Sequence, residues 1–139
     1  MKAASFVTLL LVPLVAACDS VLGDEDGQVE LSVAGGAFAA GDDVLMRVEN
    51  DSDATVFYNL CFIRLDTRSG DEWIDTDRLG NLPCPAVDPF WPGLRPNRSA
   101  EIDVALPDDV PAGTYRLRME VWEKDESGSD VATAGFQVE

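Results

Sequence analysis

Three cysteines are the most chemically distinctive residues of this 139-residue chain: Cys18, Cys61 and Cys84. A thiol can be acylated, oxidised to a disulfide or used as a nucleophile, and the last role needs a nearby base. The chain has no histidine, which is the commonest general base near neutral pH and the commonest metal ligand. We therefore expect a protein that is not an enzyme, with no catalytic residue, no cofactor and no metal site.

The charge balance is strongly acidic, with 26 acidic residues against ten basic ones and a net charge of −16. Such a surface repels nucleic acid and anionic lipid headgroups, so we expect no nucleic-acid partner. Acidic pairs such as Asp75 and Asp77 recur between apolar segments, and converging carboxylates can bind calcium. Their spacing departs from the EF-hand pattern, which favours a solvated surface and leaves a calcium-binding accessory domain as an alternative function.

The first residues have the pattern of an export signal. An apolar run from Phe6 to Val15 follows a basic residue and is too short to span a bilayer, which needs about 20 residues. Together with Val15-Ala16-Ala17-Cys18, it resembles a bacterial lipoprotein signal peptide with its lipobox. The resemblance implies that residues 1–17 are removed and that Cys18 becomes the lipidated first residue. The alternative is a plain signal peptide, with the cysteine incidental.

The signal determines the expected organisation and location of the protein. Residues 18–27 form an acidic tether that reaches at most about 30 Å, and residues 28–139 form one domain. We expect a membrane-anchored lipoprotein of the cell envelope, on its periplasmic or extracellular face. Its expected partners are the membrane, through the lipid on Cys18, and another exported or envelope protein, and the chain itself is expected to be a monomer.

Export also bears on the other two cysteines. In an oxidising compartment an even number of remaining cysteines predicts a disulfide between Cys61 and Cys84. Two unpaired thiols are the alternative, with Cys61 in the core and Cys84 exposed. A redox-active pair is disfavoured because the Cys-x-x-Cys spacing is absent.

Alternation of apolar and polar residues predicts strands rather than helices after the tether. The run from Thr55 to Leu65 is apolar on both faces, so we expect one central strand there. Segment 79–97 is rich in proline and glycine and is expected to be a loop. The other expected strands are Gln28–Ala34, Val44–Glu49, Glu72–Ile74, Ala100–Leu106, Tyr115–Trp122 and Val131–Val138. This pattern predicts an all-β fold, a single antiparallel Ig-like β-sandwich of about seven strands.

Several short motifs point to a family. Tyr115, two residues after Gly113, resembles the tyrosine corner of Ig-like sandwiches. In order along the chain, the motifs are Val48-Glu49-Asn50, Tyr58-Asn59-Leu60-Cys61, Glu72-Trp73, Cys84, Pro92-Gly93-Leu94 and Ala112-Gly113-Thr114-Tyr115-Arg116. They resemble small bacterial Ig-like-domain lipoproteins of uncharacterised function, which are distantly like BsuPI-type proteinase inhibitors. The binding-loop signatures of chagasin-type inhibitors are absent.

One aromatic pair is the candidate binding site. Phe90 and Trp91 lie in the proline-rich segment, where stiff aromatic side chains could contact a partner. The alternative is a lid, with both rings folded over an open edge of the sandwich. We therefore expect a non-enzymatic binding or structural module of the cell envelope. The alternatives are a tethered inhibitor of an extracellular protease and the calcium-binding domain.

Overall fold

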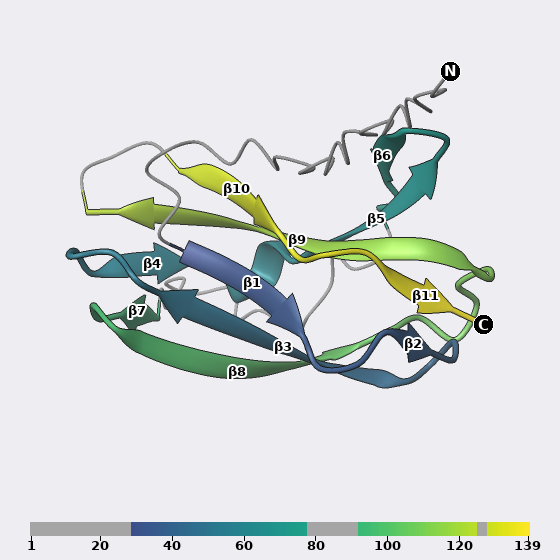
Figure 1. Cartoon of the computed structure of the whole chain (residues 1–139), viewed down its shortest axis with the longest axis horizontal. Helices are drawn as coiled ribbons and strands as arrows, with labels where there is room; N and C mark the ends of the chain where they lie inside the picture. Colours follow the sequence, from purple (N-terminus) through teal and green to yellow (C-terminus); the bar gives the residue numbers. More distant parts are fainter. Residues whose placement is uncertain (1–28, 78–91, 125–127) are drawn as a thin grey trace, which may run out of the picture.

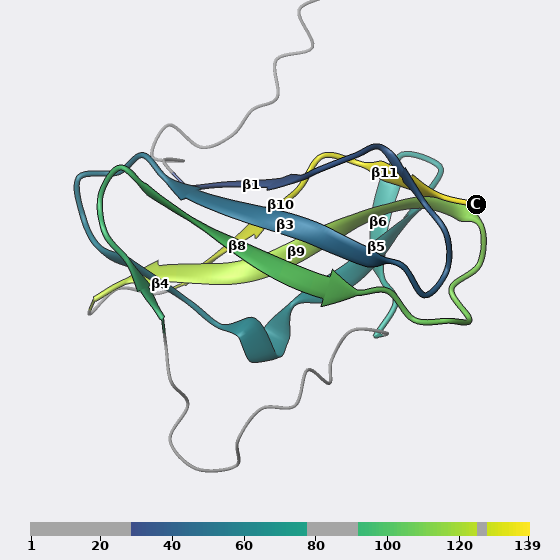
Figure 2. The same cartoon turned by 90° about the horizontal axis from the view of Figure 1, so that it is seen from below.

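The computed structural model describes residues 29–77, 92–124 and 128–139, which form two β-sheets packed face to face (Figures 1 and 2). Sheet A has the strand order β1-β3-β8, with every pair antiparallel. Its strands are β1 (Val29–Val33), β3 (Asp43–Asn50) and β8 (Arg98–Ala105). The fold is therefore an Ig-like β-sandwich, and the predicted fold class is confirmed.

Sheet B is assembled around its longest strand, β9 (Gly113–Glu123). β11 and β10 pair with β9 along one side, and β5 and β4 pair with it along the other. β6 lies beyond β5 at the rim of the sheet, and β7 lies beyond β4. The other strands are β2 (Ala37–Phe38), β4 (Val56–Tyr58), β5 (Arg64–Ser69), β6 (Glu72–Asp75), β7 (Gly93–Leu94), β10 (Ser129–Ala132) and β11 (Phe136–Val138). The β2–β11 pair is parallel, and the other pairs among the described strands are antiparallel.

The core lies between the inner faces of the two sheets. Period-two alternation places every second side chain of a strand on one face, and the apolar residues on the two inner faces are buried or half-buried. Sheet A contributes Val44, Met46 and Val48, each with no exposed surface. Sheet B contributes Tyr115, Leu117, Met119 and Val121 from β9, and Phe136 and Val138 from β11.

The start of β9 contains the expected tyrosine corner. The Tyr115 hydroxyl donates a hydrogen bond of 2.8 Å to the carbonyl oxygen of Pro111. The ring is buried, and this bond joins the turn before β9 to the strand itself. A buried hydroxyl needs a partner of this kind, so the geometry confirms the sequence interpretation of this motif.

The apolar run from Thr55 to Leu65 is not one strand, and that prediction is wrong. β4 ends at Tyr58, and a short 3-10 helix, η1 (Leu60–Phe62), separates it from β5. The side chain of Asn59 accepts a hydrogen bond of 2.9 Å from the backbone N–H of Cys61. Such a local hydrogen bond from a side chain competes with the backbone hydrogen bonds between strands, and the strand therefore ends.

No helix in the part of the chain that the structure describes is long and apolar enough to cross a membrane.

The last predicted strand is also divided, into β10 and β11. At the division the hydroxyl of Thr133 accepts a hydrogen bond of 3.1 Å from the backbone N–H of Leu117, in place of a ladder carbonyl. Within the described part of the predicted loop, residues 92–97, there is one short strand, β7, and β8 begins at Arg98, directly after the end of the loop. The two divided strands, together with the additional strands β2 and β7, give eleven strands in the described residues instead of about seven.

Candidate functional site

Most residues that the sequence singles out lie outside the described residues. Cys18, the expected lipidation site, is one of them, and so are Phe90 and Trp91, the expected partner-binding pair. Cys61 lies in η1 and is partly exposed, but its expected disulfide partner Cys84 is again outside the described ranges. The lipidation, the disulfide and the binding loop therefore stay predictions.

The acidic pairs do not converge on a metal site in the part of the chain that is described. Within residues 29–77, 92–124 and 128–139, no three Cys, Asp or Glu side chains are grouped as metal ligands would be. Asp75 instead accepts a hydrogen bond of 2.9 Å from the backbone N–H of Asp77. Asp75 also accepts hydrogen bonds from Arg64 and Arg118, so this carboxylate is used inside the protein.

The outer face of sheet B carries a cluster of charged and aromatic side chains that the sequence analysis did not identify. Because Leu65 and Leu117 face the core, the residues on either side of each face outward. β6 continues the pattern, since Trp73 lies opposite Arg68. We call this surface the arginine face and define it by Arg64, Asp66, Arg68, Trp73, Asp75, Arg116, Arg118 and Asp130.

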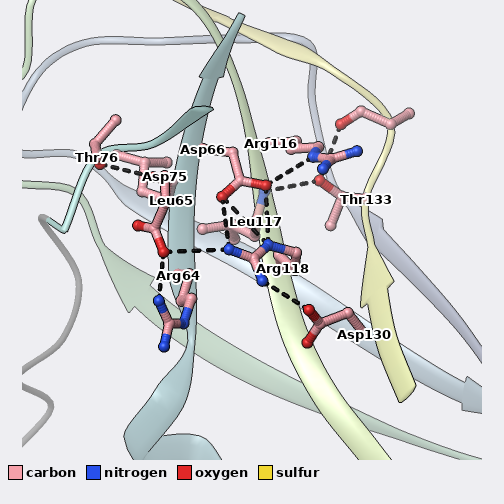
Figure 3. Close-up of polar contacts among 11 residues, drawn as sticks. Arg64, Leu65, Asp66, Asp75, Thr76, Arg116, Leu117, Arg118, Asp130 and Thr133 are labelled. Carbon is pink, nitrogen blue, oxygen red and sulfur yellow. Dashed lines mark hydrogen bonds and ion pairs between the residues drawn. The ribbon is translucent and has the colours of Figure 1, made fainter. Parts of the chain in front are cut away.

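Asp66 is the centre of the arginine face and is only 2% exposed. Arg116 lies opposite Asp66 on β9 and donates from Nε to Oδ2 at 2.9 Å (Figure 3). Arg118, two residues further along the same face, donates to both carboxylate oxygens at 3.0 to 3.3 Å. A buried carboxylate needs such pairing to remain charged, so the two arginines allow an ion to lie within the sheet.

Arg118 uses its whole guanidinium inside the protein. Nε and Nη2 bind Asp66, Nη2 also reaches Asp75 at 3.2 Å, and Nη1 binds Asp130 at 2.8 Å (Figure 3). The hydrogen bond to Asp66 contributes most to raising the pKa of Arg118, with further contributions from Asp130. Arg118 therefore joins β5, β6 and β10 to β9.

Asp75 carries a second ion pair, with Arg64. Partial burial by itself would raise the pKa of Asp75, but the N–H of Asp77 and the guanidinium of Arg64 act more strongly together, and the pKa is lowered. The hydrogen bond to Asp75 raises the pKa of Arg64 in turn. Both groups are therefore held in their charged forms.

Trp73 lies across the arginine face next to two guanidiniums. The Cζ atom of Arg116 is 4.7 Å from the ring centroid and that of Arg68 is 5.8 Å from it, within the range of cation–π attraction. A Cβ atom added to Gly135 would approach Cη2 of Trp73 to 3.3 Å. The ring thus extends from the rim strand β6 across β5 and β9 to the division between β10 and β11.

The chemistry of the arginine face favours binding over proton transfer. Arginine keeps its proton at any ordinary pH, and Asp66 is enclosed by two arginines. Guanidinium groups can instead form paired hydrogen bonds to a carboxylate or another anion. Alternation in the sequence places Arg116 and Arg118 on the outer face, but no local signal indicates that Asp66, some 50 residues away, is their partner.

Comparison with known proteins gives a distant fold similarity. No protein-family model and no curated protein matches the chain. The fold is similar to an ASH/PapD-like domain of human CEP192, at 14% identity over 99% of this chain and 93% of that chain, with a TM-score of 0.40. A family 123 glycoside hydrolase from Clostridium perfringens is similar at 13% identity over 81% of this chain and 27% of the hydrolase chain, with a TM-score of 0.37. Similarities at these levels assign no activity to the chain.

Proposed function

We propose that this protein is a membrane-anchored exported lipoprotein whose Ig-like domain is a non-enzymatic binding or structural module of the cell envelope. The lipobox residues Val15 to Cys18 support the anchor, as argued from the sequence. A tether of residues 18–27 would hold the domain close to the membrane surface. The partner is another exported or envelope protein, which the domain contacts from its anchored position.

The single observation that carries the binding role is the composition of the arginine face. Outer faces of sandwich sheets are ordinarily polar, whereas this one combines Trp73 with four arginines. Aromatic side chains and arginine are enriched in protein–protein interfaces, and the three aspartates of this face are paired with its arginines. The two large hydrophobic side chains exposed among the described residues are Phe62 in η1, at 55%, and Ile74 on β6, at 48%. Both belong to elements directly joined to β5.

An oxidising location agrees with the expected disulfide between Cys61 and Cys84. The bridge would attach the segment after β6 to η1, next to the strand that carries Asp66. Closing a loop of this length stabilises a fold by roughly 3 kcal/mol. Mass spectrometry without and with reduction tests the bridge, and an unchanged mass would contradict it.

A Cys18→Ser variant tests the anchor. Wild-type protein expressed in a lipoprotein-processing bacterium should fractionate with membranes and show an acylated Cys18 at its N-terminus by mass spectrometry. The variant should leave the membrane fraction because one thioether-linked lipid is lost. Equal membrane association of the two proteins would contradict the proposal.

Crosslinking of the lipidated protein in its own envelope tests the binding role. The expected result is a crosslink from the β5–β6 region to one defined exported protein. Crosslinks spread evenly over both sheets would contradict a specific module. If the crosslinked protein is a protease whose activity falls on binding, inhibition replaces simple binding as the function.

A further inference from the structure

In the described part of the chain, two of the four arginines of the arginine face lie against Trp73 and donate hydrogen bonds through Nε alone. Arg118 uses Nε, Nη1 and Nη2 for Asp66, Asp75 and Asp130. Arg116, by contrast, makes its hydrogen bond to Asp66 through Nε. Arg68 likewise donates from Nε, to the carbonyl oxygen of Gly70 at 3.1 Å. These two side chains are therefore oriented through Nε, which leaves their terminal amino groups for other contacts.

The terminal amino groups of Arg68 and Arg116 have little internal use in the described part of the chain. Nη2 of Arg68 is 3.9 Å from Asp71, a side chain that is fully exposed. Exposed ion pairs at this distance contribute almost nothing to stability. For Arg116, the contacts found are Asp66 and the ring of Trp73. Both guanidiniums lie against that one ring, at 5.8 and 4.7 Å.

We propose that Arg68 and Arg116, held against Trp73, bind carboxylate side chains of an acidic segment of a partner protein. This inference rests on the proposed binding function and adds the chemistry of the partner. A guanidinium that is already oriented through Nε can offer its two Nη groups to the two oxygens of one carboxylate. Little side-chain entropy remains to be lost, because the ring and the internal hydrogen bonds fix both arginines beforehand.

The charge distribution favours a protein carboxylate over a polyanion. The whole chain has a net charge of −16, which repels nucleic acid and anionic membranes at long range. The arginine face is different, because its three aspartates, Asp66, Asp75 and Asp130, are paired with three arginines, Arg64, Arg116 and Arg118. A few carboxylates at short range can therefore be accepted there.

The direct test is a titration of the full mature protein in detergent micelles, followed by NMR of the arginine Nε–H and tryptophan indole signals. The probe is a short peptide that alternates glutamate and leucine, and its matched control replaces every glutamate with glutamine. We expect the signals of Arg68, Arg116 and Trp73 to shift with the glutamate peptide and to stay unmoved with the glutamine peptide. Arg47 on sheet A should stay unmoved in both titrations.

Variants connect the signals to binding. Arg68→Gln should weaken binding of the glutamate peptide about tenfold, since it removes a charge-assisted pair. The matched control is Arg47→Gln, because the Arg47 side chain is 47% exposed and that of Arg68 is 49% exposed. Arg116→Lys keeps the positive charge but loses the planar fork, and it should weaken binding as well. Circular dichroism and the melting temperature confirm that each variant is folded before it is compared.

Three results would overturn the inference: no shift of Arg68 or Arg116 at millimolar peptide, equal losses from Arg68→Gln and Arg47→Gln, or equal shifts with inorganic phosphate. The last would indicate a general anion site rather than a site for protein carboxylates. The proposed function is tested separately. If Arg68→Gln leaves crosslinking to the envelope partner unchanged, the carboxylate site is wrong while the binding role stands.

Discussion

The outer faces of the two sheets arise from the same strand pattern but differ in how their charges are arranged. On sheet A, the outward side chains surround Arg47 with acidic neighbours, namely Glu30, Glu49, Glu101 and Asp103. Glu30 lies directly opposite Glu49, and the ion pair found on this face joins Arg47 to Glu49 on the same strand. On sheet B, the ion pairs cross from strand to strand and meet at the buried Asp66.

The difference shows two ways in which a sandwich can carry charge on its outside. The acidic face of sheet A is hydrated, so its charges contribute to solubility and little to stability. On the arginine face Asp66 is buried against Arg116 and Arg118, and the ring of Trp73 lies against Arg116, so the ions are partly removed from water. Charges in such a setting interact strongly, and leaving one of them unpaired is costly. The two faces should therefore respond very differently to the same substitution.

The largest expected effect is that of neutralising Asp66. Asp66→Asn leaves Arg116 and Arg118 without their shared carboxylate and should lower the free energy of unfolding by about 3 kcal/mol. The matched substitution on sheet A, Asp103→Asn, should change it by less than about 0.5 kcal/mol. Urea unfolding measures both values. Equal losses at the two positions would contradict the distinction between the faces.

The next effect is that of removing the aromatic cover. Trp73→Ala removes two cation–π contacts and the apolar packing on Gly135, and should cost about 2 kcal/mol. Leu45, half-buried on the outer face of sheet A, gives the comparison, and Leu45→Ala should cost under about 1 kcal/mol. Thermal unfolding followed by circular dichroism measures the difference. A smaller loss for Trp73 than for Leu45 would show that the ring does not cover the ion network.

A stabilising substitution is expected on the acidic face. Glu30→Lys replaces a like-charge pair with an attractive one across β1 and β3, and should raise the free energy of unfolding by about 0.5 kcal/mol at low salt. The gain should shrink as sodium chloride screens exposed charges. Urea unfolding at two salt concentrations tests this. A gain that persists at high salt would mean that the charges on this face are not solvated.

The smallest expected effect is the pH dependence of the stability that Asp75 contributes. The pKa of Asp75 is lowered below its ordinary value of 3.8 in the folded protein. Its contribution to stability is therefore complete above that value and is lost as the pH falls through the folded pKa. Wild type should be slightly more stable than Asp75→Asn at neutral pH, and the gap should narrow in acid. Urea unfolding from neutral to acid pH measures the difference in unfolding free energy between wild type and Asp75→Asn. A difference that grows in acid would contradict the prediction.

The inward-facing residues could be predicted from the sequence because alternation is a local property. In Val44, Met46 and Val48, and again in Leu117 and Met119, every second side chain is apolar, and all five are buried. The tyrosine corner was predictable for a similar reason, since Tyr115 and Pro111 are four positions apart. Contacts within a few residues are set by the order of the side chains along the chain.

Divisions within strands were not predictable, because they depend on competition between hydrogen bonds. The run that contains Asn59 is apolar on both sides of this residue, yet the Asn59 side chain accepts a hydrogen bond from the N–H of Cys61, and the strand ends there. The division at Thr133 has a similar origin, since its hydroxyl replaces a ladder carbonyl for Leu117. A hydrophobicity pattern contains no information about which of two acceptors a given N–H will choose.

By itself, the sequence determined the all-strand class, the inward-facing residues and the acidity of the surface, all of which follow from residue types and their period. Only the tertiary structure decided which charges meet. Asp66 lies some 50 residues from Arg116 in the sequence, and the hairpin of β5 and β6 at the rim of sheet B brings Trp73 against Arg116. The physical reason is register: the pairing of β5 with β9 sets which carboxylate faces which guanidinium, and that pairing results from packing the whole sandwich.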